Sequence, residues 1–115
     1  MRPPPVKLGY KLWLDRHGKA FGDGPYELLR RVEKTGSLHR AALDMGMSYN
    51  KAWRLMGILE KRLGFPLLER KTGGIAGGGS RLTPEGKKMM DRYGRFRKEA
   101  DRVLRKVFKD HFQKV

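Results

Sequence analysis

The stretch Gly36–Gly64, GSLHRAALDMGMSYNKAWRLMGILEKRLG, decides the fold expected for this chain. It contains two helix starts, because Ser37 and Ser48 each stand just before a run of helix-forming residues. A serine hydroxyl at such a position accepts a hydrogen bond from an unpaired amide of the first helical turn. Gly46 lies between the two segments, where a short helix must turn sharply. A short helix, a glycine-containing turn and a longer helix form the outline of a helix-turn-helix.

The apolar residues of both segments recur at spacings of three and four, so each predicted helix has one buried face. The small pair Ala41-Ala42 lets the second helix approach closely. At the start of that helix the residues off the apolar stripe face outward, where side chains can donate to base edges or phosphates. These residues are Tyr49, Asn50, Lys51, Trp53 and Arg54. Taken alone, the pattern also fits an ordinary helical pair with solvated charges. Trp53 has two interpretations, an outward-facing residue or a brace between its helix and the first helix, and we favour the brace.

The charge of the chain restricts its partners. Lysine and arginine total 27 against 12 acidic residues, a formal net charge of +15, so a polyanion is the natural partner. No apolar run reaches membrane-spanning length. The chain has no cysteine, which excludes disulfides and thiolate metal sites, and Met1–Pro5 lacks the apolar core of a signal peptide. We therefore expect a cytoplasmic protein with no membrane, metal or cofactor site.

The segment before the helix-turn-helix is expected to form a β-hairpin and then a helix. Val6–Leu14 alternates apolar and other residues, the period of a half-buried strand, and Ala20-Phe21 is a short return strand. Trp13 lies on the opposite face from the leucines, so it packs on another element or marks an interface. A helix with an apolar stripe is expected over Pro25–Thr35, with the proline at its first position.

Two further strands are expected at Leu67–Arg70 and Arg81–Thr83, joined by a glycine-rich loop. A hairpin placed directly after the second helix of a helix-turn-helix is a wing. Lys71 and Arg81 flank its base, and the glycines let the backbone approach phosphates. The loop departs from both nucleotide-binding glycine patterns, since Ser80-Arg81 follows its last glycine and no helix follows at once. A solvated loop without a ligand is the alternative.

A long helix is expected to begin at Thr83-Pro84-Glu85, with threonine as its cap and proline at its first position. Its apolar residues step by four and three in alternation, which is a heptad seam. One domain of this size has too little surface to cover so long a stripe. We therefore expect a homodimer through this helix, in preference to a helix that folds back on its own domain. The seam residues are Met89, Tyr93, Phe96, Ala100, Val103 and Val107.

Residues 25–84 resemble the winged helix-turn-helix of LysR-type transcriptional regulators. The matching signature comprises Gly36-Ser37-Leu38, Ala41-Ala42, Ser48, Leu59-Glu60, Leu63-Gly64, Pro66–Arg70 and Leu82–Gly86. More closely, the chain resembles the N-terminal domain of ModE-type molybdate-responsive regulators in Met47-Ser48-Tyr49, Ala52-Trp53 and the glycine-rich wing. The resemblance implies a dimer on a palindromic operator, with the second helix in the major groove and the wing on the DNA backbone.

ModE-type proteins carry molybdate-binding domains after the dimerisation helix, whereas this chain ends at Val115. No oxyanion sensor is therefore assigned to it, and effector sensing that is absent, supplied by a separate partner chain or replaced by another mechanism all stay open.

The sequence thus predicts one mainly α domain with small β hairpins. It is a winged helix-turn-helix, with an N-terminal β-hairpin over 1–24, helix-turn-helix and wing over 25–83, and a dimerisation helix over 84–115. The expected function is that of a sequence-specific, double-stranded-DNA-binding transcriptional regulator acting as a homodimer. A sequence-indifferent architectural DNA- or RNA-binding protein is the alternative.

An enzyme is not expected, because the three histidines are scattered and no carboxylate pair has a spacing that suits acid–base work. Asn50 and Arg54 are the candidates for base edges, because asparagine suits adenine and arginine suits guanine. The residues expected to contact DNA are Ser37, Arg40, Ser48, Tyr49, Asn50, Lys51, Arg54, Lys71 and Arg81.

Overall fold

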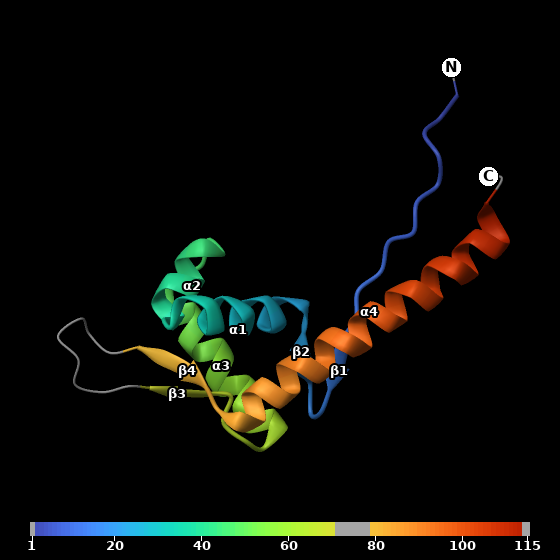
Figure 1. The fold of residues 1–115 in the computed structure, drawn as a ribbon. Helices are drawn as coiled ribbons and strands as arrows, with labels where there is room; N and C mark the ends of the chain where they lie inside the picture. Colours follow the sequence, from blue (N-terminus) through green and yellow to red (C-terminus); the bar gives the residue numbers. More distant parts are fainter. Residues whose placement is uncertain (1, 71–78, 114–115) are drawn as a thin grey trace.

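The computed structural model describes residues 2–70 and 79–113, which form an elongated molecule of 61 × 32 × 22 Å. A compact body of short helices and hairpins occupies one end, and one long helix projects from it (Figure 1). Within the described residues the elements are β1 (Trp13–Asp15), β2 (Lys19–Gly22), α1 (Asp23–Thr35), α2 (Leu38–Asp44), α3 (Tyr49–Leu63), β3 (Leu68–Arg70), β4 (Ser80–Leu82) and α4 (Pro84–Phe112).

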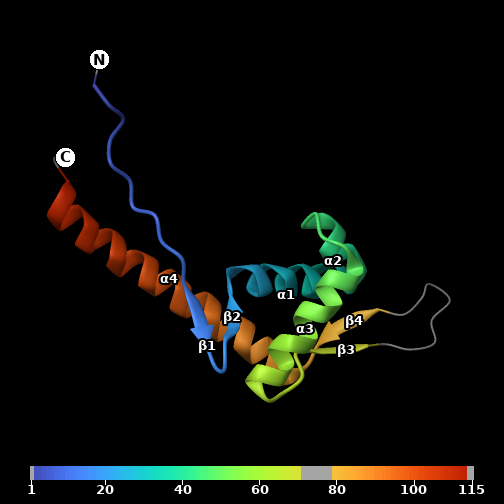
Figure 2. The same ribbon diagram turned by 180° about the vertical axis from the view of Figure 1, so that it is seen from behind.

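The N-terminal hairpin is shorter than the sequence predicts. β1 and β2 pair antiparallel with Leu14 opposite Phe21, and the turn between them holds His17 in the left-handed region at φ 58°. The expected strand over residues 6–12 is wrong, because β2 has only four residues and therefore offers ladder partners to β1 alone. The segment before β1 instead extends from the body on the same side as the outer half of α4, and its chain runs in the opposite direction (Figures 1 and 2).

The helix-turn-helix forms as predicted. α2 and α3 begin directly after Ser37 and Ser48, as expected, and Gly46 turns the chain between them at φ 70°, a conformation that glycine adopts without strain. α1 begins two residues earlier than expected, with Gly22 as its N-cap, so Pro25 stands at the third helical position and not the first. That shift costs no hydrogen bond, because the first-turn amides of a helix have no partner within it.

The core lies where α1, α2, α3, β2 and the first third of α4 meet. Phe21, Leu28 and Leu67 are fully buried there, and the ring of Tyr93 packs edge-on against Phe21 with centroids 5.2 Å apart. The helices are amphipathic, so each buries the one stripe that the sequence pattern indicates. Full burial of one such side chain stabilises the fold by about 1.5–3 kcal/mol.

The wing hairpin pairs Glu69 with Arg81 and Leu68 with Leu82. Each strand lies one residue from its predicted bounds, and most of the glycine-rich loop (71–78) falls outside the described residues. α4 follows at once, capped as expected by Thr83, whose hydroxyl accepts from the Gly86 amide at 2.8 Å. No helix in the described part of the chain is long and apolar enough to cross a membrane.

Candidate nucleic-acid interface

The packing of α3 against α2 is set by alanines. Ala41, Ala42 and Ala52 are all fully buried, and their small side chains let the two helices approach closely. Both predicted serine caps are present: Ser37 Oγ accepts from the Arg40 amide and Ser48 Oγ from the Lys51 amide, each at 3.1 Å. The start of α3 is therefore held firmly relative to α2, which is what a rigid reading element needs.

The outer face of α3 presents polar and basic side chains. Asn50, Lys51 and Arg54 are exposed, while the opposite stripe (Ala52, Met56, Leu59, Leu63) is buried. Tyr49 is half-buried and lies edge-on to His39, with ring centroids 5.5 Å apart. The first two turns of α3 thus offer one amide and two cationic side chains to solvent, the groups that hydrogen-bond base edges and phosphates.

Two of the other residues predicted to contact DNA form ion pairs within the chain. Arg40 is paired with Asp44 at 3.6 Å, and Arg81 Nε with Glu69 at 2.9 Å. All four side chains are substantially exposed, so these pairs are worth little and a phosphate can compete for the arginines. Lys71 lies outside the described residues.

Sequence reasoning missed one residue at this face. The guanidinium of Arg70, at the end of β3, lies over the indole ring of Trp53 at 3.2 Å from its centroid and 6.0 Å from that of Tyr49. Trp53 is 44% exposed, so the expectation that it braces α3 against the first helix is wrong; it supports an arginine of the wing instead. The strand alternation places Arg70 on the same face as the partly buried Leu68, but nothing in the local pattern connects that face with Trp53.

The wing is fixed to the helices by hydrogen bonds. A carboxylate oxygen of Glu60, in α3, accepts from the Leu67 amide at 2.6 Å and the Leu68 amide at 3.1 Å. On the other strand the Ser80 amide donates to Gly36 O at 2.9 Å, in the turn between α1 and α2. The hairpin therefore holds a defined position relative to α3.

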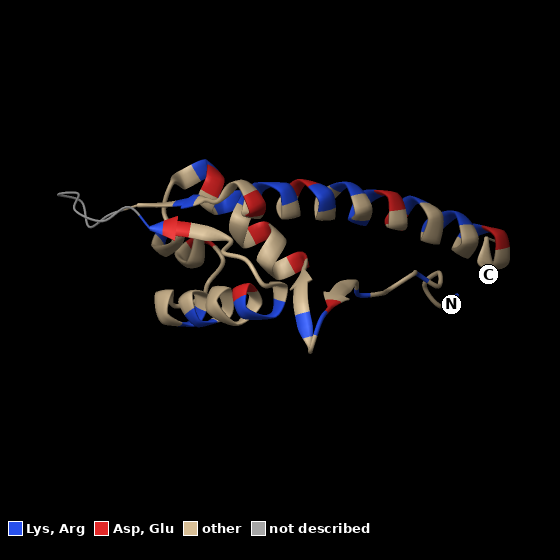
Figure 3. Ribbon diagram, turned by 90° about the horizontal axis from the view of Figure 1, so that it is seen from below, with Lys and Arg blue, Asp and Glu red and all other residues tan. Residues whose placement is uncertain are grey.

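Charge alone does not single out this face. Basic residues occur on all four helices and recur along the whole of α4, interspersed with acidic ones (Figure 3). The α3 face differs from these because its basic and amide side chains protrude together from one helix. That helix is capped at its start, packs closely against α2 and lies beside the wing.

The predicted seam of α4 divides into two parts. Tyr93 is only 1% exposed and belongs to the core of its own chain, so a partner cannot cover it, which corrects the seam at this position. Met89 is half-buried in the same region. Further along, Phe96, Val103 and Val107 are each nearly half exposed, and Ala100 is half-buried between them. An apolar face therefore extends along α4 from Phe96.

Three helices followed by a two-stranded wing define the class of winged helix-turn-helix DNA-binding domains, and solved structures of that class match. The DNA-binding domain in the crystal structure of the CbnR_DBD–DNA complex superposes with a TM-score of 0.62 at 25% identity, over 76% of this chain and 95% of that one. The crystal structure of the BenM_DBD/benA site 1 DNA complex gives a TM-score of 0.57 at 20% identity, over 76% of this chain and 93% of that one.

The chain belongs to the lysR family of bacterial regulatory helix-turn-helix proteins, whose family model matches residues 26–87. Similar proteins include the molybdenum-pterin-binding protein MopB of Rhodobacter capsulatus, 38% identical over 70% of this chain. The DNA-binding transcriptional dual regulator ModE of Escherichia coli K12 is 36% identical over 76% of this chain. The match spans 30% and 31% of the length of these two relatives.

Proposed function

We propose that this chain is the DNA-binding part of a sequence-specific transcriptional regulator that acts as a homodimer on a palindromic operator. The observation that carries the proposal is the exposed face of α3, where Asn50, Lys51 and Arg54 protrude from a helix start held by the Ser48 cap and the buried alanines. A helix of this kind fits the major groove, where its first turns reach base edges. A regulator named ModE among the relatives supports the same reading.

The contacts divide into two layers. Asn50 and Arg54 are proposed to read bases, and Lys51, Arg40, Arg81 and the amides at the two serine caps to hold phosphates. We add Arg70 to the phosphate layer. Stacking on Trp53 occupies one face of its guanidinium and leaves the N–H donors at the edge free to reach the backbone beside α3.

The homodimer is supported by the apolar face of α4. A hollow of about 630 Å³ continues that face toward the body and is lined by Leu14, Phe65, Met89 and Phe96 among others. Phe96 belongs both to the exposed face of α4 and to the lining of this hollow, so the two surfaces are continuous. For a palindrome whose half-sites are one duplex turn apart, such a dimer should hold its two α3 helices about 34 Å apart.

Selection of bound fragments from a random DNA pool tests the proposal. A regulator enriches one palindromic motif, and a selected duplex then outcompetes bulk DNA and RNA by about 10³-fold or more. The alternative, a sequence-indifferent architectural protein, rests on the net charge of +15. No enriched motif, together with equal competition by bulk DNA or RNA, supports that alternative and contradicts ours.

A further inference from the structure

α4 leaves the body of the protein at a defined place. The helix has 29 residues, and within it the buried residues are Gly86, Met90 and Tyr93, all in its first third. Figures 1 and 2 show the rest of α4 projecting away from α1, α2 and α3. The direction of the projecting part therefore depends on the contacts made just after Tyr93.

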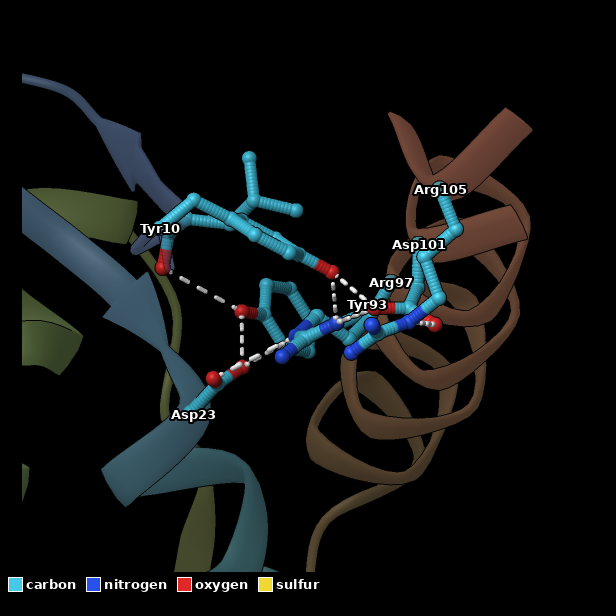
Figure 4. A network of polar contacts seen from close by, with 7 residues as sticks. Tyr10, Asp23, Tyr93, Arg97, Asp101 and Arg105 are labelled. Carbon is cyan, nitrogen blue, oxygen red and sulfur yellow. Dashed lines mark hydrogen bonds and ion pairs between the residues drawn. The ribbon is translucent and has the colours of Figure 1, made fainter. Parts of the chain in front are cut away.

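Those contacts form a polar network between α4, the first residue of α1 and the segment before β1 (Figure 4). Tyr93 Oη donates to Asp23 Oδ1 at 2.6 Å, and Arg97 Nε donates to both carboxylate oxygens of Asp23 at 3.1 and 3.3 Å. A second nitrogen of Arg97 donates to Tyr10 Oη at 2.8 Å, and Tyr10 Oη in turn donates to Asp101.

The network brings together residues 70 or more positions apart in the chain. Asp23 begins α1, Tyr10 precedes β1, and Arg97 and Asp101 lie one turn apart on α4. Beyond Asp101, the ion pairs of α4 among the described residues, Arg105–Asp101 and Lys106–Asp110, are internal to the helix. Among the described residues, the cluster of Tyr10, Asp23, Arg97 and Asp101 thus makes the last side-chain hydrogen bonds between α4 and the rest of the fold.

A small rotation at this link has a large effect. The helix runs 15 residues from Arg97 to Phe112, about 23 Å at ~1.5 Å per residue. A rotation of ~10° displaces a point ~23 Å away by ~4 Å, which exceeds the ~3.4 Å rise of one base pair. In a dimer joined through α4, that displacement appears as a change in the distance between the two α3 helices.

We propose that Asp23, Arg97 and Tyr10 are positioning residues that fix the angle of α4 and thereby select the spacing of the two operator half-sites. The inference rests on the proposed dimeric regulator and names what sets its spacing specificity. None of the three residues lies on the α3 face, so they act on the distance between the reading helices and not on the reading of either half-site.

The test uses the full chain and its selected operator, with versions in which one base pair is inserted or removed at the centre. We expect the wild type to lose at least tenfold in affinity on the altered spacings. The double variant Asp23→Asn/Arg97→Gln is expected to lose less than threefold, while its affinity for a single half-site and its dimerisation, measured by sedimentation, stay as in the wild type. Lys106→Gln is the control, because it breaks the pair with Asp110 inside α4 and touches no residue of the network; it retains the tenfold loss.

Unchanged spacing discrimination in a folded, dimeric double variant overturns the inference. If the double variant does not fold, the single variants Asp23→Asn and Arg97→Gln decide, since each removes one partner of the ion pair between α1 and α4. Wild-type discrimination in both single variants has the same meaning. A wild type that selects no motif, or that binds as a monomer, contradicts the proposed function and this inference with it. If the wild type discriminates between spacings and the variants discriminate equally well, only this inference is contradicted and the proposed function stands.

Discussion

Replacement of Glu60 tests how the wing is held to the reading helix. The Glu60 carboxylate accepts two amide hydrogen bonds, from Leu67 at 2.6 Å and Leu68 at 3.1 Å. A hydrogen bond to a charged group contributes about 1.5–3 kcal/mol, and loss of the acceptor leaves its donors unpaired. Leu67 is fully buried, so water cannot readily replace the carboxylate at its amide.

We therefore expect Glu60→Ala to lower the free energy of unfolding by about 3 kcal/mol. Glu60→Gln keeps an acceptor oxygen without the charge, and because neutral hydrogen bonds are about half as strong, it should cost about half as much. The larger loss corresponds to a fall in Tm of roughly 10–15 °C for a chain of this size.

The assay is urea unfolding followed by the helical circular dichroism signal, with all variants at one protomer concentration because dimerisation contributes to apparent stability. Glu69→Ala is the control. Glu69 bonds only to Arg81 in the described residues, on the surface, and its loss should cost less than about 1 kcal/mol. Equal losses for Glu60→Ala and Glu69→Ala would refute the reasoning.

Three further predictions concern the wing arginine, the α4 face and the Asp23 carboxyl. Arg70→Ala, made in a Trp13→Phe background so that Trp53 alone fluoresces, should shift the fluorescence emission of Trp53. It should also lower affinity equally on all DNA sequences and reduce the slope of log K against log salt concentration by about one. An unchanged emission and an unchanged slope would remove Arg70 from the interface. Phe96→Glu/Val103→Glu should sediment as a monomer while Arg102→Glu stays dimeric, and a dimeric double variant would refute the seam. Partial burial of Asp23 acts to raise its pKa, but the hydrogen bonds from Tyr93 and Arg97 outweigh it and hold the pKa below its ordinary value. Asp23 is thus charged in the folded state at lower pH than in the unfolded chain. Asp23→Asn should therefore lower the free energy of unfolding, by its largest amount above about pH 5, and this loss should disappear as pH falls through the lowered pKa. A loss that does not change with pH would contradict the prediction.

The parts of the fold that depend on local chemistry could be predicted from the sequence. The caps at Ser37, Ser48 and Thr83 and the glycine at position 46 act within a few residues of themselves, so they give α2, α3 and the start of α4 their bounds. The length of β1 could not be predicted in this way. It depends on how many residues β2 offers as partners, and the alternation of residues 6–12 carries no information about that.

The parts of the site that depend on distant residues were also missed. Arg70 reaches Trp53 only because the wing folds beside α3, and Tyr93 is buried only because α1 and β2 pack against the first third of α4. A heptad pattern shows which residues share a face, but it does not show where along the helix the domain's own core ends. That boundary, between Tyr93 and Phe96, needed the structure.

The most direct test of the account measures affinity for the selected operator and for a scrambled duplex of equal length, at one salt concentration, in the wild type and in Asn50→Ala/Arg54→Ala. Lys98→Ala, on the exposed part of α4, is the control. The double variant should lose its preference for the operator, because each lost base-reading contact lowers the binding free energy on the operator by about 1–3 kcal/mol. It should keep most of its affinity for scrambled DNA. A double variant that weakens on both duplexes by the same factor, with its operator preference intact, would contradict the claim that the outer face of α3 reads the sequence.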